Sequence, residues 1–301
     1  IISIYFSLVH FAAFFKSSSF KSRVDRNGNT SLFETAFRIT PKRNTFTFLV
    51  TRSEEIMLTA QEIRLMKSTG QKIAVTTAYD VAFASMAEIA GIDQILVGDS
   101  LANTMLGYKS TSEIGMNEME IFTAAVCRGA PNTHVIADMP YKSDETPELA
   151  LENARRLLRC GAQSVKLEGA KVEVIRTLRE NGIEVMGHLG LLPQTAKNFK
   201  QRGTTEKEAE QIFQEAKILE SLGVYAFVLE HIPEELGKKI TNAVSPVTIG
   251  IGAGSGTDGQ VLVMHDLLGL HNKKIPPFAK KFANLFEEGV AGFRSYLKMV
   301  K

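Results

Sequence analysis

The sequence predicts an α/β protein: a closed (β/α)8 barrel of parallel strands, followed by a C-terminal helical tail. Three observations carry this prediction: eight short apolar runs, longer segments of helical period between them, and glycines at the turns that lead into the runs. The length of 301 residues suits one such barrel, because this fold needs about 250 residues. We expect residues 57–301 to form it as a single catalytic domain.

The apolar runs are short and rich in β-branched residues, as expected of buried parallel strands. In chain order they occupy residues 72–77, 94–97, 133–137, 163–167, 184–186, 225–229, 246–251 and, as the weakest, 261–264. Eight strands are the number in this barrel. The segments between them, such as 146–159 and 206–222, have the i, i+3, i+4 apolar spacing of amphipathic helices that cover a sheet.

Four of the predicted helices end in similar tripeptides with a central glycine, at residues 90–92, 160–162, 181–183 and 222–224. A glycine just after a helix ends it by adopting a positive φ. These tripeptides therefore mark helix-to-strand turns at one end of the barrel. The strand-to-helix loops then lie at the other end, where barrel enzymes have their active sites.

The two ends of the chain differ from the barrel. Residues 277–300 carry phenylalanines and leucines at near-heptad spacing, which predicts a helix packed on its own barrel, with a subunit contact as the alternative. Residues 1–56 have no sustained period, and we expect a disordered leader or an extended translation. Positive charges follow the apolar start instead of preceding it, which disfavours a signal peptide; an organellar transit peptide remains an alternative.

Composition narrows the possible partners. The formal net charge of +2 gives no reason to expect nucleic acid, and no apolar run reaches the roughly 18 residues of a membrane span. The two cysteines, Cys127 and Cys160, have neither disulfide-framework nor zinc-site spacing. We therefore expect a cytoplasmic protein that acts on small molecules.

Polar residues stand where the predicted strands end. Asp99-Ser100, Asp138 and Glu168 follow the second, third and fourth runs, Lys166 lies two residues before Glu168, His188 follows the fifth run, and Glu230 follows the sixth. Each acid alone has a structural alternative, because acids after strands often cap helices. Together, however, carboxylates on three neighbouring strands would repel one another unless a cation lay among them. Asp99, Asp138 and Glu168 therefore predict a metal site, and hard oxygen ligands favour Mg²⁺, with Mn²⁺ as the alternative.

Three further side chains have predicted roles. Lys166 would bind a substrate carboxylate or polarise its carbonyl, unless it only pairs with one of the acids; a Schiff base is a third option. His188 would bind substrate, unless it is a core histidine. Glu230 ends a very apolar strand, where partial removal from water makes a carboxylate a better base; capping of the next helix is the structural alternative. The glycine-rich loop 250–256 matches a dinucleotide fingerprint only weakly, and binding of phosphate or of a flat ligand fits a barrel better.

In order along the chain, several blocks resemble the signature blocks of the ketopantoate hydroxymethyltransferase family: residues 76–80, 97–101, 107–111, 137–140, 165–169, 187–190, 229–230, 250–254 and 258–260. The resemblance covers about residues 57–301. It implies a barrel of the phosphoenolpyruvate/pyruvate type that transfers a hydroxymethyl group from 5,10-methylenetetrahydrofolate to 3-methyl-2-oxobutanoate. The product would be 2-dehydropantoate, on the way to pantothenate.

The resemblance also implies residue roles. Positions matching Asp99, Asp138 and Glu168 bind Mg²⁺, those matching Asp99, Ser100, Asp138 and Lys166 hold the oxo acid, and the position of Glu230 accepts the proton. Metal chelation of the oxo acid would acidify its C3–H and stabilise the enolate. Related enzymes are large homo-oligomers, commonly decamers.

One departure from the family pattern concerns residues 193–203, which are shorter than the glycine-rich segment usual after the His-Leu-Gly block. This puts folate contacts and closure of the site in question. Two alternatives therefore stay open: a Mg²⁺-dependent lyase or aldolase of the same barrel superfamily acting on oxo acids, and a non-catalytic folate or oxo-acid binding protein.

Overall fold

The computed structural model describes residues 23–24, 30–31 and 57–301, and the chain divides into two compact units, Ile1–Ile56 and Met57–Lys301. In the first unit the described residues form one antiparallel pair, β1 (Arg23–Val24) with β2 (Thr30–Ser31). The predictions for the leader otherwise lie outside the described residues. All of the following concerns the second unit.

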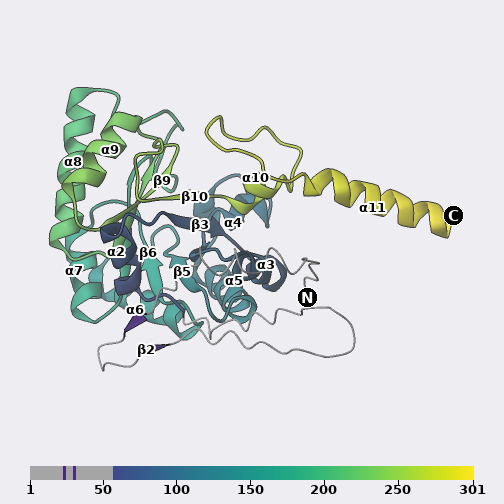
Figure 1. Cartoon of the computed structure of the whole chain (residues 1–301), viewed down its shortest axis with the longest axis horizontal. Helices are drawn as coiled ribbons and strands as arrows, with labels where there is room; N and C mark the ends of the chain where they lie inside the picture. Colours follow the sequence, from purple (N-terminus) through teal and green to yellow (C-terminus); the bar gives the residue numbers. More distant parts are fainter. Residues whose placement is uncertain (1–22, 25–29, 32–56) are drawn as a thin grey trace, which may run out of the picture. The chain divides into compact units, whose positions relative to one another are not determined.

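Eight parallel strands close into a barrel, with the order β10-β3-β4-β5-β6-β7-β8-β9 (Figure 1). This confirms the predicted fold class. The strands are β3 (Ile73–Thr77), β4 (Gln94–Val97), β5 (His134–Asp138), β6 (Ser164–Lys166), β7 (Val185–Gly190), β8 (Ala226–Glu230), β9 (Val247–Ile251) and β10 (Gly259–Leu262).

Two strands differ from their predicted positions by more than one residue at an end, and both differences involve glycines. β7 continues to Gly190 through Gly187, where helix α8 (Glu206–Ser221) packs so closely that a Cβ would lie 2.6 Å from Leu219 Cδ1. β10 begins at Gly259, where a Cβ would lie 2.4 Å from the carbonyl oxygen of Ile73 on β3. The sequence pattern missed both because a strand that needs a glycine carries no apolar side chain at that position.

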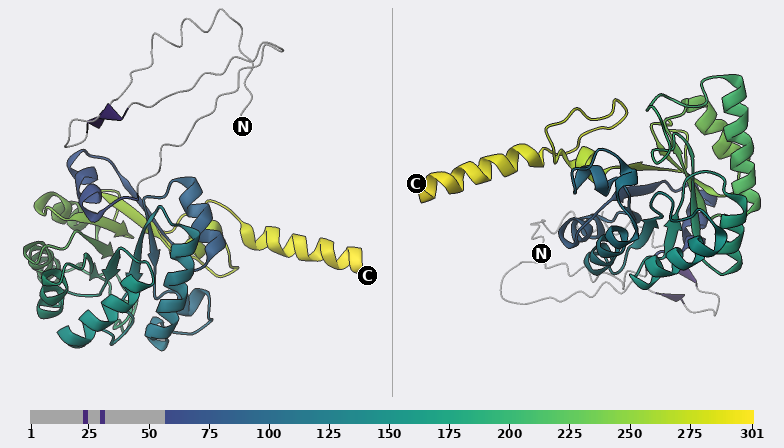
Figure 2. Two further views of the ribbon diagram at one scale, coloured as in Figure 1. Left: turned by 90° about the horizontal axis from the view of Figure 1, so that it is seen from below. Right: turned by 180° about the vertical axis from the view of Figure 1, so that it is seen from behind.

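Helices follow the strands and surround the barrel (Figure 2). Several begin with side-chain caps, such as Asp80, Thr146 and Thr205, each of which accepts a hydrogen bond from the third residue of its helix. The helices are α2 (Ala60–Ser68), α3 (Val81–Ala90), α4 (Leu101–Thr104), α5 (Met116–Gly129), α6 (Pro147–Arg159), α7 (Val172–Glu180), α8 (Glu206–Ser221), α9 (Glu234–Ala243), α10 (Met264–Leu268) and α11 (Leu285–Val300), with a 3-10 turn, η1, at Thr111–Glu113.

The core has two layers. One apolar cluster lies between the strands and the outer helices. The other fills the inside of the barrel, where residues such as Ile136 and Val228 are joined by Ile63 and Met66 of α2. Because α2 precedes the first barrel strand and packs on this inner cluster, it covers the amino-terminal end of the barrel. The carboxyl ends of the strands are left as the open end.

The C-terminal helix differs from its prediction. The tail is helical only from Leu285, eight residues after the predicted start at Pro277. No residue of α11 is buried, and Phe293 and Met299 are 78% and 75% exposed. Figures 1 and 2 show the helix extending away from the barrel. The prediction that this tail packs on its own barrel is therefore wrong for α11. Within the described part of the chain, no helix is both long and apolar enough to cross a bilayer.

Candidate active site

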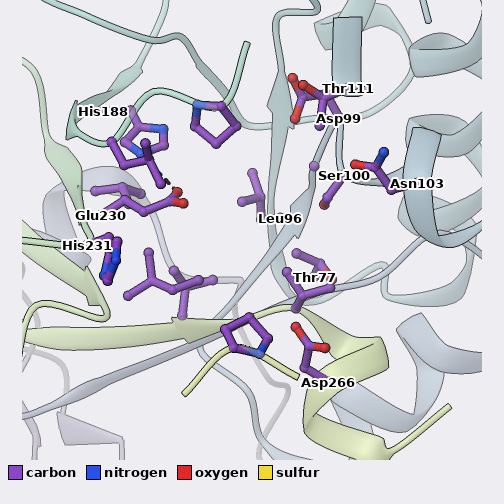
Figure 3. A pocket seen from close by; sticks show the side chains of 18 of the residues that line it. Thr77, Leu96, Asp99, Ser100, Asn103, Thr111, His188, Glu230, His231 and Asp266 are labelled. Atoms are coloured by element: carbon purple, nitrogen blue, oxygen red, sulfur yellow. Dashed lines mark ion pairs between the residues drawn. The ribbon is translucent and has the colours of Figure 1, made fainter. Parts of the chain in front are cut away.

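A cavity of about 680 Å³ opens at the carboxyl ends of the strands, and every barrel strand or the residues directly after it contribute to its lining (Figure 3). All seven side chains to which the sequence assigns a role line this cavity: Asp99, Ser100, Asp138, Lys166, Glu168, His188 and Glu230. The barrel thus brings them together, as the strand-end argument predicts. Their individual roles stay predictions.

We call Asp99, Asp138, Lys166, Glu168, His188 and Glu230 the acid half of the cavity. β5 and β6 pair with Asp138 opposite Lys166, so the barrel register itself places the ammonium group beside the carboxylate. Lys166 forms an ion pair with Asp138 Oδ1, and the backbone N–H of Asp99 donates to Asp138 Oδ2 at 3.0 Å. All three residues are buried, so the ion pair is shielded from water.

Gln194, which the sequence reasoning missed, connects the remaining carboxylates. Its side-chain Nε2 donates to Asp99 Oδ2 at 2.8 Å and to the Met139 carbonyl at 3.0 Å. Its backbone N–H donates to Glu168 Oε2 at 3.2 Å. Gln194 belongs to the shortened segment 193–203 after β7, and a polar residue in a strand-to-helix loop was the signal that could have found it.

His188 lies between Glu168 and Glu230. Its Nδ1 is 3.8 Å from Glu168 Oε1, and its Nε2 is 3.2 Å from Glu230 Oε2. Neither ring nitrogen has a hydrogen-bond partner of good geometry among the described residues. Burial lowers the pKa of His188, so the ring is neutral. A buried, neutral and unpartnered imidazole beside a cavity can donate one hydrogen bond to a bound ligand.

Glu230 is the most accessible side chain of this group, with 17% of its side chain exposed. Figure 3 shows its carboxylate directed into the cavity, with Asp99 and Ser100 on the opposite side. It ends β8 after four buried apolar residues, and the following helix α9 begins only after Pro233. Since Glu230 makes no cap hydrogen bond to α9, the capping alternative is not supported.

The acid half has more carboxylates than positive charges. Burial, together with the neighbouring Asp138, raises the pKa of Asp99 to about 7. Burial also raises the pKa of Glu168 to about 9. For Lys166, burial alone would lower the pKa, but the neighbouring carboxylates, first among them Asp138, raise it above the usual range. One ammonium group thus serves several carboxylates, and a further cation would stabilise the charged form of the site.

The donor set fits Mg²⁺ as a two-carboxylate site. Among the described residues, no three His, Cys, Asp or Glu side chains converge closely enough to hold a metal ion. Asp99 and Asp138, however, are adjacent, and Mg²⁺ is usually held by one or two carboxylates with waters and substrate oxygens. Glu168 is held by the backbone of Gln194, so it stands at the edge of such a site. Metal binding by Asp99, Asp138 and Glu168 stays a prediction.

Ser100 is held by a second residue that the sequence reasoning did not single out. The Tyr79 hydroxyl and Ser100 Oγ are 2.8 Å apart, and Tyr79 is fully buried. Burial raises the pKa of Tyr79 to about 12, so its hydroxyl stays protonated. Gly98 allows this approach, since a Cβ there would lie 2.9 Å from Ser100 Oγ. Ser100 is thus fixed at the cavity wall with its hydroxyl oriented.

The rest of the lining is different, and we call His231, Ile251, Val263, Asp266 and Phe278 the apolar half. Of these residues only Ile251 lies in the glycine-rich loop 250–256, and no role was predicted for the others. The loop supports this half, because Gly252 at φ 63° lies against Phe278: a Cβ there would be 2.8 Å from its ring. Binding of phosphate or of a flat ligand by this loop stays a prediction.

A parallel barrel with ionisable groups gathered at the carboxyl ends of its strands defines an enzyme whose substrate is a small molecule. Comparison with known proteins identifies its kind. The model of the ketopantoate hydroxymethyltransferase family matches residues 57–301, and the chain belongs to this family. The chain is accordingly a transferase.

Two relatives show how far the similarity extends. The 3-methyl-2-oxobutanoate hydroxymethyltransferase of Thermotoga neapolitana is 47% identical over 250 residues, covering 81% of this chain and 92% of that protein. The enzyme of the same name from Syntrophus aciditrophicus is 43% identical over 258 residues, covering 83% and 95%. The similarity thus extends over nearly the whole of each relative.

Solved structures with low sequence identity share the fold. The chain matches 2,3-dimethylmalate lyase, described as a PEP mutase/isocitrate lyase superfamily member, with a TM-score of 0.54, 18% identity and coverage of 81% of this chain and 88% of that chain. It matches phosphonopyruvate hydrolase in complex with oxalate and Mg²⁺ with a TM-score of 0.55, 12% identity and coverage of 69% and 81%. These matches confirm the barrel fold.

Proposed function

We propose that the chain transfers a hydroxymethyl group to 3-methyl-2-oxobutanoate, giving 2-dehydropantoate for pantothenate biosynthesis. The donor is 5,10-methylenetetrahydrofolate, one water is consumed, and tetrahydrofolate is released. Membership of the family supports the reaction. The observation that carries it is the placement of Glu230 in the cavity, facing a buried group made of one lysine and several carboxylates.

Lys166 and Asp99 of the acid half, together with the neighbouring Ser100, can bind the oxo acid. Lys166 supplies the positive charge for the substrate carboxylate, while the Ser100 hydroxyl, fixed by Tyr79, can donate to a substrate oxygen. The adjacent carboxylates of Asp99 and Asp138 would hold Mg²⁺, or Mn²⁺, with Glu168 at the edge of the site; this metal would withdraw electrons from the oxo acid and make its C3–H more acidic. A protein of the same fold, crystallised with oxalate and Mg²⁺, is a precedent.

Glu230 is the proposed base. Water first adds to the methylene carbon of the donor and both carbon–nitrogen bonds break, so that tetrahydrofolate leaves and formaldehyde remains. Glu230 takes the proton from C3 of the oxo acid, the electron pair left on C3 forms the new bond to the formaldehyde carbon, and the carbonyl oxygen takes up the proton and becomes the new hydroxyl group. Neutral His188 lies 3.2 Å from Glu230 and can donate a hydrogen bond to a substrate oxygen that gains negative charge. Since Glu230 is more exposed than the other acids, it can reach a ligand in the cavity.

The test is an assay for dehydropantoate with purified full-length protein, 3-methyl-2-oxobutanoate, methylenetetrahydrofolate and Mg²⁺. Product should form only with all components present, and EDTA should abolish it. Consumption of an oxo acid without folate would instead identify a lyase or aldolase. Tight binding of both substrates by folded protein without turnover would identify a binding protein.

A homo-oligomer, with a decamer as the assembly implied by resemblance, is the second part of the proposal. Its support is α11, whose Phe293, Tyr296 and Val300 are exposed although the helix has an apolar face. An isolated helix of 16 residues is only marginally stable in water, so a partner subunit would explain its order. Light scattering should give a multiple of the mass of one chain. A monomer at micromolar concentration would contradict this part.

The proposed location is the cytoplasm, because the cysteines do not form a disulfide. Cys127 and Cys160 are both free thiols. Free thiols persist in a reducing compartment. Fractionation of native cells, with mass spectrometry of the N-terminus, would test the location together with the transit-peptide alternative.

A further inference from the structure

His231 has a backbone conformation that is unusual for its type. It lies directly after Glu230 and lines the cavity with φ at 47°, in the left-handed region. This region disfavours residues with a Cβ, and strain of this kind is concentrated at functional sites. Two backbone hydrogen bonds hold it there: His231 N–H donates to Ile251 O at 2.8 Å, and Arg202 N–H donates to His231 O at 2.9 Å. The chain thus maintains an unfavourable conformation beside the proposed base.

The ring of His231 is half of an aromatic pair. Its centroid lies 5.6 Å from that of Phe278, at an interplanar angle of 44°. Phe278 is 36% exposed, and its ring also lies against Gly252, where no side chain would fit. Pro277 and Ile251 continue this surface into the cavity lining. A half-exposed aromatic side chain that forms a cavity wall can bind one face of a flat ligand.

Asp266 supplies the polar group of the apolar half. Figure 3 shows it near Thr77, across the cavity from Glu230 and His231. Its side chain is 14% exposed, and its Oδ1 lies 3.0 Å from His271 Nε2. Among the described residues, no hydrogen bond reaches its Oδ2. The charge of this carboxylate plays no part in the acid half, and one of its oxygens is free to accept from a ligand.

We propose that the apolar half is the binding site for the pterin ring of the folate donor, with the His231–Phe278 pair covering one ring face and Asp266 accepting from the amino-pyrimidinone edge. That edge presents two adjacent N–H groups, a pattern that a carboxylate binds well. The inference rests on the proposed function, because it assigns a place to the second substrate of that reaction.

Size and position both support this assignment. A cavity of about 680 Å³ is much larger than a small branched oxo acid requires and is within the range for drug-sized ligands. Since His231 and Glu230 are consecutive, a ring held by His231 lies next to the proposed base. The methylene carbon of the donor would then face the carbon from which Glu230 takes the proton. The apolar half and the acid half would thus each hold one of the two reacting molecules.

The experiment measures 5-formyltetrahydrofolate binding by calorimetry and the KM values for both substrates, using the full-length protein and three variants. Asp266→Asn and Phe278→Ala should each weaken folate binding, and raise the KM for methylenetetrahydrofolate, about tenfold or more. The KM for 3-methyl-2-oxobutanoate should stay within about twofold, since these residues contact only the donor. Tyr141→Ala is the matched control for Phe278→Ala, because Tyr141 is 38% exposed but does not line the cavity.

A third variant, His271→Ala, separates ligand contact from local structure. It removes the internal partner of Asp266 but leaves the carboxylate, so it should affect folate binding less than Asp266→Asn does. Equal effects of these two variants, or an unchanged folate affinity in Phe278→Ala, would overturn the assignment. Thermal melts show whether each variant is folded.

The catalysed reaction and the folate subsite can be tested separately. Wild-type protein that binds 5-formyltetrahydrofolate but forms no dehydropantoate would contradict the proposed function and leave the subsite intact. Wild-type protein that turns over normally, with variants whose KM for the folate is unchanged, would contradict only the subsite.

Discussion

The acid half of the cavity takes its side chains from the ends of strands β4 to β8, whereas most of the apolar half comes from loops and from the segment after α10. In the acid half, strand register determines which side chains lie next to each other, as for Asp138 and Lys166. In the apolar half, the positive φ angles of His231 and Gly252 determine where the side chains of the lining lie. The first half is built on paired strands and is highly charged, and the second is shaped by turns.

This difference suggests that each half of the cavity binds a different substrate. Buried charges held by a barrel suit recognition of a small, charged and invariant group such as a 2-oxo carboxylate. A loop-built aromatic surface suits a large, flat ligand that must enter and leave. If the halves act separately, changes in one should alter the binding of one substrate only. The following predictions test that separation, from the largest expected effect to the smallest.

The largest effect is expected for Glu230→Gln. Removal of the proposed base should lower kcat by about 10²–10⁴-fold, because general-base catalysis contributes that much. The KM values of both substrates should change little, since the amide has the same shape. Steady-state kinetics at saturating Mg²⁺ measures this effect.

Glu235→Gln is the matched control for the base. It makes the same chemical change on an exposed position of α9, five residues along the chain from Glu230. Its kcat should equal that of the wild type. A Glu230→Gln enzyme that keeps more than about a tenth of wild-type kcat would show that another group takes the proton.

A large loss of stability is expected for Lys166→Met. The substitution leaves Asp138 buried beside Asp99 without its cation, which should cost about 3–5 kcal/mol in the free energy of unfolding. The double variant Lys166→Met/Asp138→Asn should recover part of that loss, because it removes the unpaired charge. Urea unfolding of metal-free protein measures both. A double variant less stable than Lys166→Met alone would contradict the pairing.

The same charges predict how stability depends on pH. The pKa of Asp99 is raised to about 7 and that of Glu168 to about 9, so the folded protein holds protons that the unfolded chain releases near pH 4. Stability of the metal-free protein should therefore fall as pH rises from about 4 to about 9. The raised pKa of Lys166 adds stability that is lost only at still higher pH.

Urea unfolding in EDTA across this pH range checks the sign of the slope. Glu168→Gln should flatten the upper part of the decline, since it removes the group with the higher raised pKa. Stability that increases with pH over this range would show that the carboxylates are ionised in the folded protein, with lowered instead of raised pKa values.

Gln194→Ala should have an intermediate effect, on metal affinity. The side chain orients Asp99 by a 2.8 Å hydrogen bond, and loss of such an outer contact weakens metal binding by about 10–100-fold. Mn²⁺ titration followed by electron paramagnetic resonance measures this directly. Gln211→Ala, on the exposed face of α8, is the control. Unchanged affinity in Gln194→Ala would mean that the barrel alone orients Asp99.

The two halves also differ in how much of them could be predicted from the sequence. Barrel, strand order and the acid half follow from periodicity, because an acid or a lysine at the end of an apolar run is conspicuous. Gln194 and Asp266 were missed because they lie on loops or short helices that have no period. His231 was missed because nothing in its sequence position shows a positive φ. The exposure of α11 was not predicted, because an apolar spacing does not show whether a helix packs on its own chain or on another molecule.

The smallest effect is expected for His231→Gly, and it separates strain from function in the apolar half. Glycine adopts φ near 47° without a Cβ clash, which should offset its entropy cost and leave the free energy of unfolding unchanged or up to about 1 kcal/mol higher. Lys142→Gly makes the same backbone change at φ 67°, outside the cavity, and should leave the kinetics unaltered. In His231→Gly, by contrast, the KM for the folate donor should rise although the protein is no less stable. A clear loss of stability in His231→Gly but not in Lys142→Gly would mean that the His231 ring serves packing rather than ligand binding.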